Sequence, residues 1–175
     1  MILYVAKKKK PVILATGASS LKEVTTIVKK ILKINNKIVL MQCNTNYTGQ
    51  KNNFKYINLN VLNKYKKKFP KVILGLSDHT HGHETVLGAV AMGARVIEKH
   101  FTDDNFKVGP DHAFSMNPNT WSEMVKRTRN LEQSFGDGEK KIEKNELESS
   151  IVQRRCIRAR FDIPKNTKIT KSLLI

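Results

Sequence analysis

Residues 72–102 read V-I-L-G-L-S-D-H-T-H-G-H-E-T-V-L-G-A-V-A-M-G-A-R-V-I-E-K-H-F-T, and this stretch decides the fold. An apolar run, residues 72–76, ends in Ser-Asp-His-Thr, and a second short apolar run, residues 96–97, ends in Glu-Lys-His. Small and apolar residues recur between them at helical spacing. The stretch therefore predicts a strand, a helix and a second strand. Polar groups follow each strand, at the end where parallel α/β proteins bind ligands.

The alternation of side chains along a strand groups the polar residues further. Ser77 and His79 are expected on one face of the first strand, and Glu98 and His100 on one face of the second. If the strands are neighbours, about 4.8 Å apart, the two imidazoles can reach one ion. Two histidines with open coordination positions suit a catalytic divalent metal, and Mn, Mg, Zn and Fe all remain possible.

A purely structural interpretation of the same residues stays open. Asp78 or Thr80 can cap the helix that follows, and both histidines can be scaffold groups with satisfied ring nitrogens. The pattern of this stretch alone does not separate the two interpretations.

The composition is that of a water-soluble domain. The chain has 175 residues, which is enough for one domain with a hydrophobic core. Hydrophobic residues make up 39% of it, and the mean hydropathy is −0.42. No apolar run approaches the roughly 20 residues of a membrane span.

The N-terminus carries its lysines after its apolar residues, the reverse of a signal peptide, so we expect a cytoplasmic protein without a membrane partner. Cys43 and Cys156 have no metal or redox spacing and are expected to be reduced thiols.

The net charge of +17 raises the question of a nucleic-acid partner. The basic residues are spread over solvent-facing helix positions, and no basic motif rich in aromatic residues is present. An anionic small substrate fits the charge as well. We therefore do not expect nucleic acid to be the partner.

The rest of the chain repeats the strand–helix pattern. Strands are expected at residues 12–14 and 38–41, and amphipathic helices at residues 21–32, 57–69 and 120–135. Ser20 with Glu23, and Thr120 with Glu123, have capping-box spacing. The polar loop 44–53 contains Thr45, Tyr47, Thr48 and Gly49, which are either solvated loop residues or contacts to substrate hydroxyls. Another long loop, after His100, carries Asp103, Asp104, Asp111 and His112.

Four such units in about 135 residues match half of a (β/α)₈ barrel, which takes roughly 250 residues. A free-standing four-stranded parallel sheet is the alternative, although its edges would need cover. Residues 140–149 are charged without an apolar face, as in a linker, and Cys156–Phe161 alternates like a strand.

Five ordered motifs resemble the sialic acid synthase family, whose members make N-acetylneuraminate and related nonulosonic acids. They are P-V-I-L-A-T-G at 11–17, Q-C-N-T-N-Y at 42–47, G-L-S-D-H-T at 75–80, I-E-K-H-F-T at 97–102 and G-P-D-H-A-F-S-M-N-P at 109–118. The resemblance implies an α/β fold: strands five to eight of a TIM barrel in residues 1–138, a linker at 139–150, and the start of a small β-rich antifreeze-like (SAF) domain at 151–175.

The activity implied by the resemblance is a transferase reaction of carbohydrate biosynthesis. It condenses phosphoenolpyruvate with N-acetylmannosamine or a related hexosamine and releases phosphate. The family uses a divalent metal, usually Mn²⁺ with Mg²⁺ possible, and forms homodimers. A legionaminate, pseudaminate or spore-coat sugar synthase is the alternative, as is a fragment that is inactive on its own.

The resemblance also implies roles for seven residues. His79 and His100 occupy the positions of the metal ligands, and Glu98 that of the active-site glutamate; these three are the expected catalytic residues. The expected substrate-binding residues are Thr45, Tyr47, Ser77 and Asp111, the last near the sugar.

Some features of the family pattern are changed or missing. Ala15 stands where many relatives have a serine that contacts phosphate, and Thr45 where others have asparagine or serine. The basic residues of the family's first four strands have no counterpart here, nor does an arginine that the partner subunit's antifreeze-like domain supplies. The resemblance therefore implies the family function more firmly than activity of this chain alone.

Overall fold

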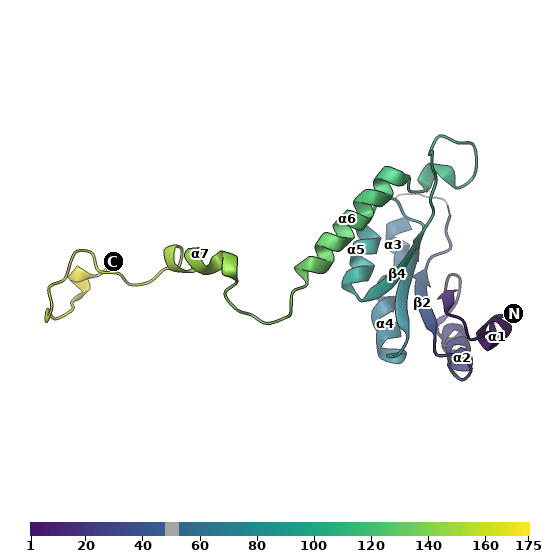
Figure 1. Ribbon diagram of the computed structural model, residues 1–175, viewed down its shortest axis with the longest axis horizontal. Coiled ribbons are helices and arrows are strands. Elements are labelled where there is room, and N and C mark those ends of the chain that lie inside the picture. The colour runs from purple at the N-terminus through teal and green to yellow at the C-terminus, as the bar shows by residue number, and fades with distance from the viewer. Residues whose placement is uncertain (48–52) are drawn as a thin grey trace. The chain divides into compact units, whose positions relative to one another are not determined.

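Four parallel strands form the centre of the computed structural model, which describes residues 1–47 and 53–175 (Figure 1). They are β1 (Val12–Ala15), β2 (Ile38–Cys43), β3 (Ile73–Asp78) and β4 (Ala94–Lys99), and they pair in chain order, β1-β2-β3-β4. The predicted parallel α/β fold is confirmed. Thr48 and Gly49, named above as loop contacts, lie outside the described residues.

Helix α1 (Ile2–Lys7) precedes the first strand, and α6 (Pro118–Ser134) follows the last. The helices between the strands are α2 (Leu21–Leu32), α3 (Phe54–Ile57), α4 (Val61–Lys68) and α5 (Glu84–Ala91). Figure 1 shows α5 and α6 side by side. The pattern did not predict α1. The single helix predicted over residues 57–69 is wrong, because Asn58 takes the left-handed conformation (φ 51°) and separates α3 from α4. No helix in the described part of the chain is long and apolar enough to span a membrane.

The caps of the two long helices test the sequence signals directly. The capping box of Ser20 and Glu23 at α2 is confirmed. The box predicted for Thr120 and Glu123 is wrong: Asn117 caps α6, and its side chain and that of Thr120 accept each other's backbone N–H groups at 3.0 Å. Asparagine before a proline at the first helical position is a strong helix start. Glu123 instead pairs with Arg127 one turn later.

One face of the sheet carries the main core. Leu40 and Leu76 point to this face and are fully buried, together with Val28 of α2 and Leu62 of α4. These four residues belong to one apolar cluster, in which helix faces with 3.6-residue periodicity meet strand faces of period two. The helices therefore pack on this face of the sheet.

The opposite face of the sheet is much less covered. Ile13 of β1 is 59% exposed and Ile73 of β3 is 50% exposed, although both are apolar strand residues. Val39 of β2, which pairs with Ile13 on one side and with Ile73 on the other, is buried. Among the described residues the sheet also has two open edges, because β1 and β4 each pair with one strand there. A parallel sheet usually has cover on both faces.

Gly75 allows the close packing of the three strands that lead to the histidines. The pairing of β3 with β4 shifts between Leu74 and Gly75. A Cβ atom at Gly75 would lie 2.7 Å from the carbonyl oxygen of Val96 and 2.9 Å from Cγ of Met41. The absence of a side chain thus lets β2 and β4 approach β3 at this irregularity.

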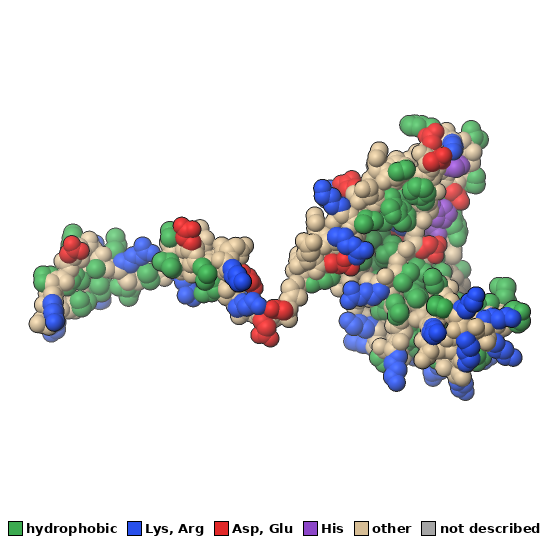
Figure 2. Space-filling view, in the orientation of Figure 1, with side chains coloured by type: hydrophobic (Ala, Val, Ile, Leu, Met, Phe, Trp, Pro, Cys, Tyr) green, Lys and Arg blue, Asp and Glu red, His purple; other side chains and the backbone are tan. Residues whose placement is uncertain are grey.

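Positive charge is concentrated in the first half of the chain. Residues 1–77 contain sixteen lysines and one acidic residue, Glu23. Lys10, Lys37 and Lys71 precede strands, whereas the histidines of interest follow strands. In Figure 2 the blue side chains of the first half gather mostly away from the purple histidine side chains, although blue also lies beside the uppermost purple one. The large net charge is therefore not a property of the end of the sheet where the histidines lie.

The chain divides into two compact units, Met1–Phe135 and Gly136–Ile175. The second unit contains η3 (Lys144–Glu146), α7 (Leu147–Val152) and η4 (Lys171–Leu173). Part of the segment predicted as a linker, residues 139–150, is thus helical. The strand predicted at Cys156–Phe161 is wrong, because it reduces to one antiparallel bridge, Ala159 to Leu174, flanked by hydrogen bonds such as Arg158 N–H to Ile175 O. This short unit has few residues that could cover the apolar face of a strand.

We predict that Gly75→Ala destabilises the first unit by about 1–3 kcal/mol, because the added methyl group must displace backbone of β4. Urea unfolding followed by circular dichroism measures the change. Gly88→Ala is the control, since its Cβ would meet only the end of the Leu59 side chain at 2.8 Å, which can rotate away. Equal losses in both variants would contradict this account of Gly75.

We also predict that Asn117→Ala destabilises α6 by about 1 kcal/mol through loss of the cap. Glu123→Ala, which removes only a solvent-exposed pair one turn further on, is expected to cost less. Thermal unfolding of the two variants in parallel measures the difference. A larger loss in the Glu123 variant would restore the original assignment of the cap.

Candidate active site

The two histidines lie side by side at the carboxyl ends of β3 and β4. The register pairs Ser77 with Glu98 and Asp78 with Lys99, so His79 and His100 follow at the next position. Their ring centroids are 5.0 Å apart, with the ring planes at 71°. The predicted sharing of a face by these residues is confirmed.

A backbone carbonyl fixes the tautomer of His79. Its Nδ1 atom lies 2.7 Å from the carbonyl oxygen of Asn44, at the end of β2. A carbonyl oxygen only accepts, so Nδ1 carries the proton and donates it. The other ring nitrogen, Nε2, then keeps a free lone pair in the neutral ring. Histidines that bind metals have this arrangement. His79 is otherwise buried.

The loop after β4 surrounds His100. Its Nδ1 atom lies 3.5 Å from Oδ2 of Asp111, and its ring lies 5.1 Å from the Phe114 ring, centroid to centroid. Phe114 ends a short 3₁₀ helix, η2 (His112–Phe114). The Asn105 side-chain amide donates to the carbonyl oxygens of His112 and Ser115, which holds this turn in place. The long loop therefore places Asp111 beside the histidine pair.

Tyr47, from the loop after β2, closes a third side of the pair. Its ring centroid lies 4.3 Å from that of His79 and 5.6 Å from that of His100. Half of the Tyr47 side chain is exposed. The three rings thus form one cluster that is open to solvent on the Tyr47 side.

A row of polar side chains lies one layer below the histidines. Cys43, Ser77 and Glu98 are register neighbours across β2, β3 and β4. Cys43 and Ser77 are buried, whereas Glu98 is exposed. Burial raises the pKa of the Cys43 thiol, with Glu98 contributing in the same direction. Thr45 lies against Gly17, where any Cβ atom would collide with the threonine methyl group.

The pair suits a divalent metal as two ligands of an incomplete set. In residues 1–47 and 53–175, no group of three or more His, Cys, Asp and Glu residues could hold an ion together. Two imidazole nitrogens would leave the remaining positions to water or substrate, as at a catalytic metal. Imidazole ligands suit Zn or Fe, whereas Mn and Mg also call for oxygen ligands, which water or substrate would supply here.

All seven predicted residues therefore gather at the carboxyl ends of β2, β3 and β4. Sequence reasoning missed the Asn44 carbonyl and the Phe114 ring as neighbours of the histidines. The first acts through backbone and leaves no sequence signal. It also missed the ion pair of Asp78 and Lys99, which the strand alternation could have indicated, since both residues alternate with the histidine face.

We predict that iodoacetamide modifies Cys156 well before Cys43 in the folded chain near pH 8. Cys156 is exposed, whereas Cys43 is buried with a raised pKa, so less of its thiol is ionised at a given pH. Mass spectrometry of timed samples measures the order, and modification in urea serves as the control. Similar rates for both thiols before unfolding would contradict the burial of Cys43.

Comparisons with known proteins identify the family of the chain. The chain is 37% identical to the N,N'-diacetyllegionaminic acid synthase of Legionella pneumophila over 98% of this chain and 49% of the relative. It is 30% identical to human N-acetylneuraminate-9-phosphate synthase over 97% and 46%. The N-acetylneuraminic acid synthetase structure from Leptospira borgpetersenii superposes with a TM-score of 0.74 at 29% identity, covering 88% of this chain and 54% of that one. The chain spans about half the length of these relatives. Residues 1–140 match the NeuB family, to which this chain belongs.

Proposed function

We propose that this chain carries one half of the active site of a nonulosonic acid synthase. The synthase joins phosphoenolpyruvate to N-acetylmannosamine or a related hexosamine and releases phosphate. The observation that carries the proposal is the pair of His79 and His100, with ring centroids 5.0 Å apart and His79 Nδ1 engaged by a carbonyl. The pair stands where two strands end, as expected for a catalytic site of a parallel α/β protein.

The reaction needs a nucleophilic carbon, an electrophilic aldehyde and a place for phosphate to leave. Carbon 3 of phosphoenolpyruvate attacks the sugar aldehyde, water adds at carbon 2, and the tetrahedral intermediate loses phosphate. A divalent ion such as Mn²⁺, held by His79 and His100, would supply Lewis acidity toward the aldehyde oxygen.

The side chains of this chain would orient the substrates around that point. Glu98 is exposed on the histidine face and so is available to hydrogen-bond a sugar hydroxyl or to move a proton. Asp111 is half-exposed beside His100, and Tyr47 presents an aromatic wall to a sugar ring. Ser77 and Thr45 would complete the polar contacts near phosphoenolpyruvate.

The second half of the site would come from four further strands of a barrel. The chain spans 49% of the Legionella relative. Ile13 and Ile73 remain exposed on the face that would become the barrel interior. These two observations support the view that the chain needs a complement for full activity.

The test measures phosphate release from phosphoenolpyruvate that depends on added sugar, in the presence of Mn²⁺. Two samples are compared: the chain alone, and the chain refolded together with a polypeptide that comprises the first barrel half of the Legionella relative. We expect activity in the complemented sample, abolished by a chelator and restored by Mn²⁺. His79→Ala should lose at least ~100-fold, because a metal ligand is removed. The matched control is His81→Ala, an exposed histidine two residues away. Equal activity of the two variants would sink the proposal.

The choice of sugar is the second part of the test. The relatives named above make different products, so their names do not select one. N-acetylmannosamine and a 2,4-diacetamido hexose should be compared as substrates in the same assay. Preference for the second would favour a legionaminate-type synthase, and preference for the first a sialic acid synthase. No release with either sugar in the complemented sample would leave the chain as an inert fragment.

A further inference from the structure

A buried ion pair joins β3 to β4 on the side of the sheet away from the histidines. Nζ of Lys99 lies 2.6 Å from Oδ2 of Asp78, and the two side chains are 2% and 0% exposed. Lys99 also donates to the carbonyl oxygen of Thr80 at 2.7 Å, and Thr85 of α5 donates to Asp78 at 2.6 Å. The backbone N–H and the hydroxyl group of Thr80 also donate to the carboxylate.

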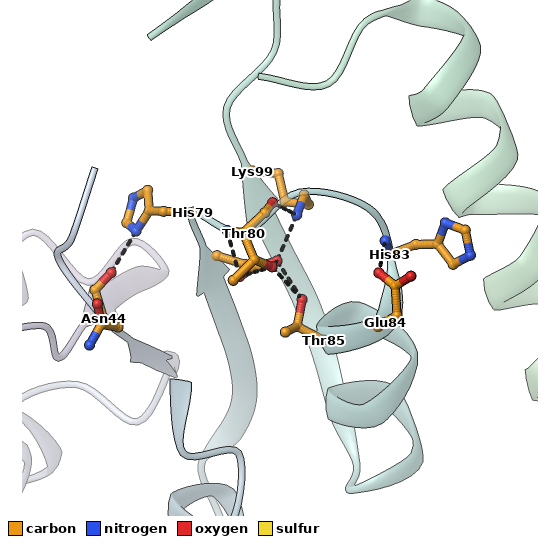
Figure 3. A network of polar contacts seen from close by, with 8 residues as sticks. Asn44, His79, Thr80, His83, Glu84, Thr85 and Lys99 are labelled. Carbon is orange, nitrogen blue, oxygen red and sulfur yellow. Dashed lines mark hydrogen bonds and ion pairs between the residues drawn. The ribbon is translucent and has the colours of Figure 1, made fainter. Parts of the chain in front are cut away.

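This network holds the residues on both sides of His79. Asp78 precedes the histidine and Thr80 follows it, and both are anchored in the network. Lys99 in turn precedes His100. Side chains alternate along a strand, so when Asp78 and Lys99 are held on one face of the sheet, the imidazoles of His79 and His100 lie on the opposite face. Figure 3 shows His79 pointing away from Lys99 and Thr85.

The energetics of burial argue that the pair fixes geometry. Two charges lose their hydration when they are buried, and replacing such a pair with apolar side chains is often neutral or stabilising. An apolar pair at positions 78 and 99 would therefore fill the same space at no greater cost. It would not, however, bind the carbonyl of Thr80 or fix the lateral distance between the strand ends.

We propose that Asp78 and Lys99 are positioning residues, whose buried ion pair locks the ends of β3 and β4 so that His79 and His100 present their free nitrogens to one ligand. This inference rests on the proposed function for the identity of that ligand. Neither residue faces the substrate side of the sheet, so both act through the histidines. Groups beyond the ligands commonly change metal affinity 10–100-fold.

The test combines two readouts on the whole chain. The first is the nuclear Overhauser effect between the ring protons of His79 and His100 in histidine-labelled protein, expected for centroids 5.0 Å apart. The second is Mn²⁺ affinity, measured by electron paramagnetic resonance. The double variant Asp78→Asn with Lys99→Met keeps the volumes and removes the cross-strand bond. The double variant should lose the contact between the rings and bind Mn²⁺ at least ~10-fold more weakly. The single variant Lys99→Arg, which keeps the positive charge, should retain part of the ring contact and part of the Mn²⁺ affinity.

The matched control is Val28→Ala, which weakens the core on α2, a helix that contributes no residue to the ion-pair network. It should lower the melting temperature comparably and leave both readouts intact. The inference is wrong if the double variant keeps both readouts, or if the control loses them equally. If the double variant does not fold, Thr85→Val, which removes one hydrogen bond to Asp78, decides by the same measurements.

The two proposals can fail separately. A wild-type chain that binds no Mn²⁺ would contradict the proposed function. The contact between the histidine rings would then decide the positioning role by itself, since it needs no metal.

Discussion

The pairing register of β3 with β4 is the constraint on which the site depends. A shift of one residue would turn His79 or His100 to the helix side and bring a charged neighbour to the open face. The sequence places a residue of opposite charge on the helix side of each strand, at Asp78 and Lys99, and these meet at 2.6 Å. A slipped register would leave the charge on the strand that did not shift buried without its partner, which is far more costly than the pair itself. Register and histidine geometry are therefore specified by the same two residues.

The strands and the site face were largely predictable from the sequence because both depend on local alternation. Apolar runs that end in polar residues identified all four strands, and period-two alternation assigned Ser77, Glu98 and both histidines to one face. The positions of Tyr47 and Asp111 followed from the family resemblance instead. Loop residues have no periodicity, so their approach to the histidines depends on contacts such as Asn105 to His112 that no spacing rule describes.

Three secondary-structure predictions failed because a pattern of residue spacing does not register competing interactions or missing partners. A helix start was assigned to Thr120 from spacing alone, although Asn117 before Pro118 competes for the same role and wins. The helix over residues 57–69 was assigned from apolar periodicity, which continues across the left-handed break at Asn58. The alternation of Cys156–Phe161 did not produce a strand because a strand needs partners, and the second unit supplies only a short antiparallel bridge.

The order of the strands in the sheet is also their order in the chain, and this has a consequence for assembly. Each strand pairs with the one made just before it, after an intervening helix, so the sheet can grow stepwise as the chain emerges during synthesis. No strand must be inserted between two that are already paired. Strands added beyond β1 or β4, whether covalently attached or not, would extend the sheet without displacing any existing pair. Such a topology suits assembly from separate segments, because consecutive strands pair with each other and need no strand from elsewhere between them.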